Sequence, residues 1–348
     1  MVRVGIIGLG GIARNVHIPG IVEAAGGKIT AICDPKESML KEVGDAYGIP
    51  ENRRFQNYLE LIHCADVDAV EICSPNFLHV PMAIEAVRAG KAINVEKPLS
   101  VNYAEAKKLE DALQENSVPN MMCFSCRFLP AVRYAKELLD QGLLGDILSV
   151  NAEYLKSSAF WAGRRLEWRF IKEYAGTGVL GDLGVHLVDM ARLLVGDMTR
   201  VCSETGIAVK QRKMRSSDEL GNVETDDYCF FMADFACGAH GMFTVTRCAI
   251  GHENTIRFDI FGTKGSLSFN LNTPDEISLC IGEADAKGCS FHTVKVPDGY
   301  KASQEQMFID LVSGKDCQYL PTAADGLRSQ KVLDALLESS EKHCWVSV

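Results

Sequence analysis

The sequence predicts an α/β chain with a doubly wound parallel sheet at its start, followed by a mixed α/β domain with a large, mainly antiparallel, open sheet. Two observations lead to this prediction. Up to about residue 123, short apolar runs alternate with helical stretches at a spacing typical of strand–helix–strand units. Beyond Gly145, strand-like runs follow one another with glycine-bearing turns and almost no helical crossovers. We therefore expect two domains, residues 1–123 and residues 124–348.

The composition limits the class of protein. The 348 residues are 47% hydrophobic and 24% charged, which is ordinary for a globular chain of two domains. With a net charge of −10 and no basic run, nucleic acid is not an expected partner. Because no apolar stretch is long enough to span a bilayer and the apolar start lacks a charged leader, we expect no membrane association and a cytoplasmic location. The thirteen cysteines then favour free thiols in a reducing compartment.

The first strand and the turn after it suggest a dinucleotide site. Val2–Ile7 is apolar and runs into Gly8–Ala13, a turn of the form G-x-G-x-x-A. Such a turn lets the backbone approach a pyrophosphate, and the next helix offers its first N–H groups to the phosphates. A second strand, 28–33, ends at Asp34, where a carboxylate would bind the adenosine ribose hydroxyls. Asp34 would also repel a 2′-phosphate, so NAD is favoured over NADP, although Lys36 softens this preference.

Alternation continues through the first domain. We expect helices at 37–47, 58–62, 79–89 and 103–115, and strands at 69–73, 92–95 and 118–124, with Asn102 as a helix cap. The strand 92–95 ends in Glu96-Lys97-Pro98, and a lysine at the carboxyl end of a buried strand lies where open α/β sheets bind ligands. The alternative for Lys97 is a solvated lysine at a strand end. His79 is either a ligand-binding residue or an ordinary histidine at a helix start.

The second domain reads as a succession of strands. They are expected at 147–154, 228–235, 241–248, 255–261 and 266–270, with a last amphipathic helix over 325–342. A large open antiparallel sheet needs a cover for one face, and self-association is one solution.

Polar residues recur along one apolar stretch, 175–196. At helical spacing Asp182, His186 and Asp189 lie on one face, and buried carboxylates and imidazoles need partners or a task. Proton transfer is one such task, since a carboxylate can hold a histidine in place. Metal binding is less favoured because no third and fourth ligands are evident. The alternative is a satisfied polar pair near a helix start.

Cysteines do not complete a metal site either. Cys123 and Cys126 have the C-x-x-C spacing, yet no second pair or nearby histidine accompanies them, so we interpret them as core residues and expect no bound metal.

Together these motifs resemble the glucose–fructose oxidoreductase / inositol dehydrogenase / rhizopine catabolism family (Gfo/Idh/MocA) over nearly the full length. EKP combined with D-x-G-x-H is the most specific part of the match. The motifs are GLGGIA at 8–13, SPNFLH at 74–79, AGKAINVEKPLS at 89–100, CRFLPA at 126–131, EWR at 167–169, GDLGVHLVD at 181–189 and FGTKG at 261–265. Ser125, where the family often has asparagine, and the segment 161–165 depart from the pattern.

The resemblance implies a Rossmann domain, a second domain whose sheet forms a homodimer or homotetramer, and hydride transfer between NAD and a sugar, glycoside or cyclitol. Position by position, Lys97, Asp182 and His186 match the family's catalytic residues. The implied cofactor contacts are Gly8, Gly10, Gly11, Ile12, Asp34, Ser74, Pro75, Asn76, His79, Glu96, Lys97, Arg127, Trp168 and Arg169. The implied substrate contacts are Lys97, Arg127, Arg165, Asp182 and His186.

Oxidation of a secondary alcohol requires a base and a group that stabilises the oxygen. We expect His186 to accept the hydroxyl proton, Asp182 to orient the imidazole or bind a substrate hydroxyl, and Lys97 to hold the reacting oxygen. The division of the base role between Lys97 and His186 stays open. Arg164, Arg165, Arg169, Trp161 and Trp168 suit a polyhydroxylated substrate, because sugars stack on aromatic rings and bind charged donors; plain surface charge is the alternative for Arg164 and Arg165.

Two other functions are compatible with this resemblance. Some relatives use a tightly held NAD for transient oxidation that permits glycoside cleavage without net redox change. The other is a non-catalytic, NAD-binding regulator.

Overall fold

The computed structural model describes residues 1–161 and 163–348, so Ala162, in the segment 161–165 noted above, lies outside the described residues. The chain divides into two compact units. The first comprises Met1–Ser125 and Ala302–Arg328, and the second comprises Cys126–Lys301 and Ser329–Val348.

A parallel sheet forms the centre of the first unit. Its strands, within the described residues, follow the order β3-β2-β1-β4-β5-β6, and every ladder is parallel. The strands are β1 (Val2–Ile7), β2 (Gly27–Cys33), β3 (Arg54–Phe55), β4 (Ala69–Ile72), β5 (Ala92–Val95) and β6 (Asn120–Met122). The direction of the order reverses between β1 and β4, which confirms the predicted doubly wound sheet.

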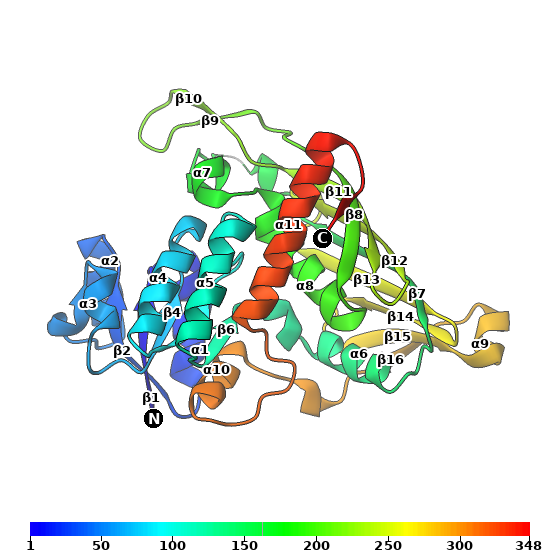
Figure 1. Cartoon of the computed structure of the whole chain (residues 1–348), viewed down its shortest axis with the longest axis horizontal. Coiled ribbons are helices and arrows are strands. Elements are labelled where there is room, and N and C mark those ends of the chain that lie inside the picture. Colours follow the sequence, from blue (N-terminus) through cyan, green and yellow to red (C-terminus); the bar gives the residue numbers. More distant parts are fainter. Residues whose placement is uncertain (162) are drawn as a thin grey trace. The chain divides into compact units, whose positions relative to one another are not determined.

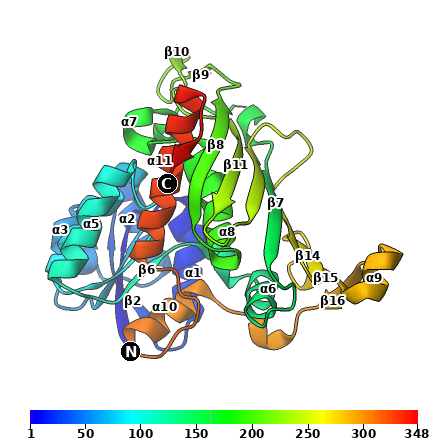
Figure 2. The same ribbon diagram turned by 45° about the vertical axis from the view of Figure 1, so that its right-hand side comes forward.

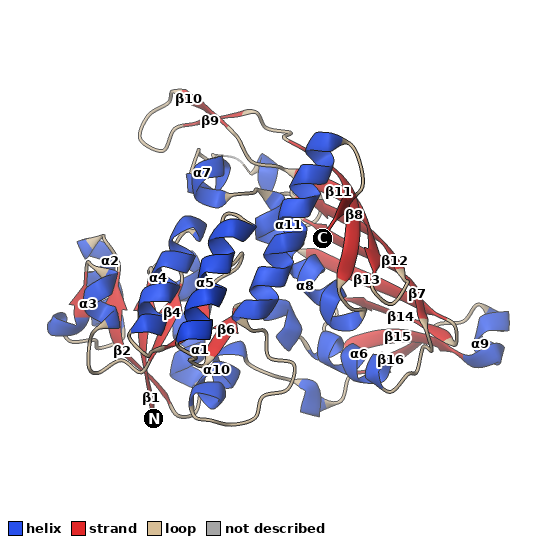
Figure 3. Cartoon of the chain, in the orientation of Figure 1, coloured by secondary structure: helices blue, strands red, loops and turns tan. Residues whose placement is uncertain are grey.

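Helices flank this sheet (Figures 1 and 3). They are α1 (Ile18–Glu23), α2 (Glu37–Ala46), α3 (Tyr58–Ile62), α4 (Asn76–Arg88), α5 (Tyr103–Glu115) and α10 (Gln304–Val312). The cap of α5 is the predicted one, since the Asn102 side chain accepts the Glu105 N–H at 2.8 Å. The last strand begins at Asn120, later than expected, because Pro119 has no N–H to donate to a ladder, and it ends at Met122.

The first unit also contains residues 302–328, which the predicted boundary after residue 123 assigned to the second domain. Helix α10 packs against α1. The Ile309 side chain is 1% exposed, and its carbons would lie 3.1 Å from a Cβ at Gly27. The Ala25 N–H donates to Gln306 Oε1 at 2.7 Å. The apolar face of α10 is thus buried against the first unit, which explains why residues 302–328 belong to it.

The second unit is built on a large sheet. Its described strands follow the order β16-β15-β14-β13-β7-β12-β11-β8-β17. They are β7 (Ile147–Leu155), β8 (Met198–Gly206), β11 (Tyr228–Phe235), β12 (His240–Thr246), β13 (Thr255–Gly262), β14 (Gly265–Asn270), β15 (Glu276–Ile281), β16 (His292–Lys295) and β17 (Val346–Ser347). Among them β12 pairs with β7 in parallel and the other ladders are antiparallel, as predicted. Figure 2 shows β8, β11 and β7 running across this sheet.

The second unit has further elements besides this sheet. They are the hairpin of β9 (Gln211–Lys213) and β10 (Leu220–Asn222), with α6 (Pro130–Asp140), α7 (Lys172–Ala175), α8 (Val185–Leu194), α9 (Gly282–Gly288) and the C-terminal part of α11 (Ala323–Lys342). Helices α6 and α8 and the last turns of α11 lie against one face; for example, the Ser203 N–H of β8 donates to Ser339 Oγ at 2.9 Å.

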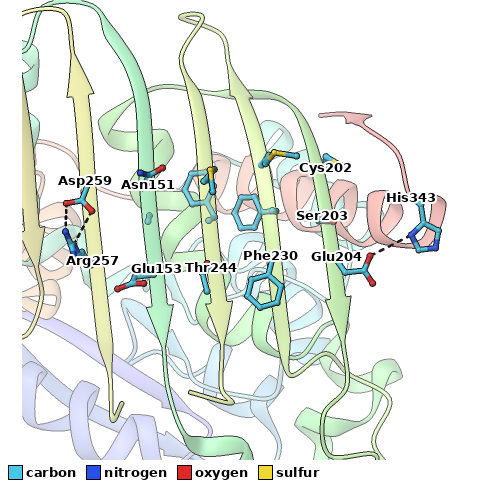
Figure 4. A pocket seen from close by; sticks show the side chains of 15 residues that line it. Asn151, Glu153, Cys202, Ser203, Glu204, Phe230, Thr244, Arg257, Asp259 and His343 are labelled. Carbon is cyan, nitrogen blue, oxygen red and sulfur yellow. Dashed lines mark hydrogen bonds and ion pairs between the residues drawn. The ribbon is translucent and has the colours of Figure 1, made fainter. Parts of the chain in front are cut away.

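The opposite face of the sheet carries exposed apolar side chains. Along β11, Cys229, Phe231 and Ala233 are buried, whereas Phe230 and Met232 are 48% and 45% exposed. This is the period-2 alternation of a strand with one face covered. Figure 4 shows Phe230 standing on this face with polar side chains of the neighbouring strands around it.

None of the helices in the described part of the chain combines the length and the hydropathy needed to cross a membrane.

A buried ion pair in the second unit provides a test of its stability. Arg247 and Asp227 are 1% and 0% exposed, and Arg247 Nε donates to Asp227 Oδ1 at 2.5 Å. We predict that Arg247→Ala lowers the free energy of unfolding by about 3–5 kcal/mol, because it leaves a buried carboxylate without its cation. Urea unfolding followed by tryptophan fluorescence measures this, since all three tryptophans belong to the second unit.

The control for this measurement is Lys287→Ala, which removes an exposed ion pair to Glu283. Such pairs contribute about 0–1 kcal/mol. Equal unfolding midpoints for Arg247→Ala and the unmodified protein would contradict the prediction.

Candidate functional site

In the first unit, four adjacent strands end side by side. Ile7 at the end of β1 pairs with Cys33 of β2 and with Ile72 of β4, and Ile72 pairs with Val95 of β5. The residues that follow these ends are therefore neighbours at one edge of the sheet, where parallel sheets bind ligands. These residues are Gly8, Asp34, Ser74-Pro75-Asn76 and Glu96-Lys97.

The glycine turn has the geometry that a phosphate-binding loop needs. Gly8 has φ +88°, and a Cβ there would lie 2.8 Å from the Cys73 carbonyl oxygen, so only glycine is accommodated. A Cβ built at Gly10 meets no atom within 4 Å, which means that its backbone faces open space. Asp34 accepts hydrogen bonds from the Leu9 N–H and the Lys36 N–H, both at 2.9 Å. This edge therefore suits a nucleotide, with the Asp34 carboxylate held at the end of the turn.

The segment after the turn differs from a regular α-helix. Residues Ala13–His17 form a π-helical turn before α1 begins. Such wide turns often occur at functional sites. Here the turn ends at His17, whose side chain is 1% exposed.

His17 is the centre of a buried charged cluster that our sequence analysis missed. Its Nε2 lies 2.8 Å from Glu96 Oε1, and its Nδ1 lies 3.1 Å from Glu71 Oε1 and 3.3 Å from Glu305 Oε1. Although burial opposes the charge, the carboxylates raise the pKa of His17 well above its usual value. Burial opposes ionisation of Glu96 as well, but the hydrogen bond and charge of His17 lower its pKa to about 2.

Glu71 is the most deeply buried carboxylate of this cluster. It is fully buried, and burial raises its pKa to about 7. Its two carboxylate oxygens accept hydrogen bonds from Asn94 Nδ2 at 2.9 and 3.0 Å. The cluster leaves no periodic pattern in the sequence, because Glu71 and Asn94 are polar residues inside otherwise apolar strands and their partners are distant in sequence.

The cluster does not suit a metal ion. One ligand atom each of His17, Glu71 and Cys123 would lie within 4.8 Å of the others. A cysteine binds metal as the thiolate, however, and burial together with the nearby carboxylates raises the pKa of Cys123 well above its usual value. The Cys123 thiol instead donates to Asn94 Oδ1 at 3.4 Å. The donor set is that of a hydrogen-bonded network.

His79 links the ends of two strands. Its Nδ1 lies 2.8 Å from the Pro98 carbonyl oxygen and its Nε2 lies 2.8 Å from the Ser74 carbonyl oxygen. Burial lowers the pKa of His79. Both ring nitrogens thus contact backbone, so the structure gives this residue an anchoring role beside Lys97, and contact with the nicotinamide ribose stays a prediction.

The predicted catalytic helix in the second unit begins in a second π-helical turn. Leu180–Gly184 forms this turn and α8 continues from it. Asp226 caps the start, because its carboxylate accepts the N–H of Gly178 at 2.6 Å and of Leu180 at 2.8 Å. A Cβ at Gly178 would lie 2.0 Å from the Asp226 carbonyl oxygen, which requires glycine there.

Asp182 and His186 lie close together in sequence on this element but differ in burial. Asp182 is half-buried within the wide turn, and His186 is 5% exposed on α8. The ring of Tyr154, from β7, lies 6.3 Å from the His186 ring and is tilted by 49°. The Tyr154 hydroxyl donates to Asn254 Oδ1 at 2.8 Å. Tyr154 is a further side chain at this site that our sequence analysis did not identify.

Asp189 has a different role from the one its helical spacing suggests. Its two oxygens accept hydrogen bonds from Arg127 Nε at 2.7 Å and Nη2 at 2.5 Å. Both side chains are buried. This bidentate pairing fixes the plane of the Arg127 guanidinium, and both oxygens of Asp189 are engaged by Arg127.

In the loop before α7, three arginine side chains pack against one aromatic ring. The guanidinium carbons of Arg164, Arg212 and Arg247 lie 4.8, 4.5 and 4.9 Å from the centre of the buried Phe170 ring. Arg212 Nη2 also donates to the Ala159 carbonyl oxygen at 2.7 Å. Arg164 is therefore a packed residue of the loop, with a side chain that is 16% exposed, which excludes the plain-surface alternative for it.

The other predicted substrate residues of this loop are more open. Arg165 is exposed, and its Nη1 donates to the carbonyl oxygens of Met214 and Ser217 at 2.8 Å. The Arg169 guanidinium carbon stacks 4.3 Å from the Trp168 ring centre. The structure thus places Lys97 in the first unit, and Asp182, His186, Arg127, Arg165, Trp168 and Arg169 in the second.

Comparison with known proteins agrees with both units. Residues 2–124 match the model of an oxidoreductase family with an NAD-binding Rossmann fold, and residues 132–268 match the GFO/IDH/MocA C-terminal domain. The chain is 32% identical to levoglucosan dehydrogenase of Pseudarthrobacter phenanthrenivorans, over 90% of each chain. It is 26% identical to glucose-6-phosphate 3-dehydrogenase of Bacillus subtilis, over 100% of this chain and 99% of the relative.

Solved structures give the same result. A levoglucosan dehydrogenase in complex with NADH and L-sorbose aligns with a TM-score of 0.91 and 30% identity, covering 100% of this chain and 99% of that chain. An oxidoreductase domain protein from Kribbella flavida aligns with a TM-score of 0.90 and 28% identity over 100% of both chains. These matches establish that the chain belongs to the Gfo/Idh/MocA family and is an NAD-dependent dehydrogenase of the sugar dehydrogenase type.

Proposed function

We propose that this protein oxidises a ring secondary alcohol of a sugar, glycoside or cyclitol. The observation that carries the proposal is the position of Lys97, which follows the strand β5 at the same sheet edge as the glycine turn and Asp34. The full-length relatives named for levoglucosan, glucose 6-phosphate and inositol support this substrate class.

In this proposal the protein's residues orient the substrate and move one proton. NAD, when bound, accepts the hydride from carbon. His186 accepts the hydroxyl proton, and Asp182 orients the imidazole or binds a neighbouring hydroxyl. Lys97 holds the reacting oxygen and stabilises its developing negative charge. Arg127, fixed by Asp189, supplies a donor of constant orientation to cofactor or substrate. The convergence of Lys97 with Asp182 and His186 on one substrate is part of the proposal.

The alternative functions receive no support from the comparisons. The named relatives include dehydrogenases of sugars and inositols, and Lys97, Asp182 and His186 are all present. Neither redox-assisted glycoside cleavage nor a non-catalytic regulatory role is favoured by a specific observation.

A direct assay tests the proposed reaction. We predict that NADH absorbance rises when the protein is mixed with NAD and at least one member of a panel containing levoglucosan, glucose 6-phosphate, inositol and their neutral and charged analogues. NADP should give a lower kcat/KM because of the Asp34 carboxylate. Glycoside cleavage without accumulation of NADH would contradict the proposal.

Substitution of the proposed base provides a second test. We predict that His186→Ala reduces kcat by about 100-fold or more while the protein stays folded, because general-base catalysis contributes about 10²–10⁴-fold. The control is His292→Ala, an exposed histidine that pairs with Asp285. Turnover of His186→Ala equal to that of His292→Ala would remove His186 from the mechanism.

We also infer that the open face of the second sheet joins copies of this chain into a homodimer or homotetramer. Phe230, Met232 and Met242 are 48%, 45% and 64% exposed on adjacent strands. Single exposed apolar residues are normal on protein surfaces, but a contiguous group of them indicates an interaction site. The polar side chains around them, including Asn151 and Glu153 (Figure 4), resemble the rim of an interface.

The free thiols of all thirteen cysteines suit the cytoplasmic location that we propose.

A charge placed on this face should prevent assembly. We predict that Phe230→Lys combined with Met242→Lys shifts the protein to the monomer in light scattering after size exclusion, because the interface would have to bury two ammonium groups. Val22→Lys, at an exposed apolar position of the first unit, serves as the control. An unchanged mass for the double variant would exclude this face as the interface.

A further inference from the structure

The backbone around Lys97 is held on both sides by buried histidines. On one side, Glu96 Oε2 accepts the Lys97 N–H at 3.1 Å, and Glu96 Oε1 lies 2.8 Å from His17 Nε2. On the other side, the Pro98 carbonyl oxygen lies 2.8 Å from His79 Nδ1. Lys97 itself is half-buried between these two contacts.

These contacts hold the backbone at Lys97, where the strand has ended and regular hydrogen bonds between strands no longer do so. Strand β5 ends at Val95, and residues 96–100 have no regular secondary structure. A lysine in such a segment would sample several directions unless other groups fixed its peptide. Glu96 is 8% exposed, and His17 and His79 are each 1% exposed, so each contact is made in a dry interior where a lost partner is costly.

The surroundings of His17 favour one arrangement of this contact. Glu71 and Glu305 approach the Nδ1 side of the ring, and Glu96 approaches the Nε2 side. Rotation of this ring would break the 2.8 Å contact between Nε2 and Glu96 and would move Nδ1 away from Glu71 and Glu305. The Nε2–Glu96 contact therefore has a fixed direction, and through Glu96 it fixes the Lys97 peptide.

We propose that His17 is a positioning residue: acting through Glu96, it fixes the backbone of Lys97 so that the ammonium group points to the reacting oxygen. His79 acts on the Pro98 carbonyl from the other side. This inference rests on the role of Lys97 in the proposed function. His17 lies 80 positions before Lys97 in the numbering, so only the fold brings the two together.

A double-mutant cycle separates positioning from a general structural role. We predict that His17→Leu lowers kcat by about 10- to 100-fold, because a displaced catalytic group loses that much. His17→Gln, which keeps a donor for Glu96, should recover most of the loss. In a Lys97→Met background, His17→Leu should cause no further loss of kcat, because its effect passes through Lys97. The Kd for NAD, measured by fluorescence titration, should stay within about twofold.

Several results would overturn the inference. They are an equal fold-loss from His17→Leu in both backgrounds, and a weakened Kd for NAD with unchanged kcat. The exposed His63 of the same unit provides the control, and His63→Leu should change none of these quantities. If His17→Leu does not fold, Glu96→Gln in the same two backgrounds completes the cycle. Unchanged kcat for Lys97→Met alone would show instead that the proposed role of Lys97 is wrong.

Discussion

The common edge at which the parallel strands of the first unit end is the constraint on which the candidate site depends. Because β2, β1, β4 and β5 are neighbours in register, the residues after them become neighbours whatever their separation in sequence. Asp34, Gly8 and Lys97 are brought together in this way. The order of the strands reverses between β1 and β4, so the helices that would cover this edge diverge and leave it accessible.

Behind that edge lies an interior that is unusually charged for a parallel sheet. Glu71 and Asn94 occupy central strands where apolar residues are normal, and both are 0% exposed. Burial of such groups is tolerated because each has partners: Asn94 and His17 for Glu71, and His17 and the Lys97 peptide for Glu96. The network connects the π-helical turn that follows the glycine turn, strand β4, the end of β5 and α10, so it adds a polar contact to the apolar packing of α10 in this unit.

The second unit presents its polar residues by comparable means. A buried carboxylate, Asp226, caps the wide turn that carries Asp182, and another, Asp189, holds the guanidinium of Arg127. In both units a π-helical turn lies at the start of the candidate helix, where it displaces side chains from the positions of a regular helix. The buried carboxylates of Asp226 and Asp189 therefore orient neighbouring groups, whereas the half-buried Asp182 is more accessible to solvent than either of them.

The sequence alone determined the doubly wound sheet, the mainly antiparallel second sheet, the glycine turn, Asp34, and the caps and breaks around α5 and β5. These follow from local patterns, since apolar period, glycine, proline and capping residues act within a few positions. The family could be recognised as well, because its motifs are short and contiguous.

Only the tertiary structure decided which polar groups meet. His17, Glu71, Glu96 and Glu305 are spread over almost the whole chain, and no periodicity marks them as partners. The pairing of Asp189 with Arg127, the anchoring of Pro98 by His79 and the inclusion of α10 in the first unit are likewise contacts between distant segments. A buried charged or polar group is costly unless it is paired. The partner available to each group is set by the packing of the whole domain, which the local sequence does not encode.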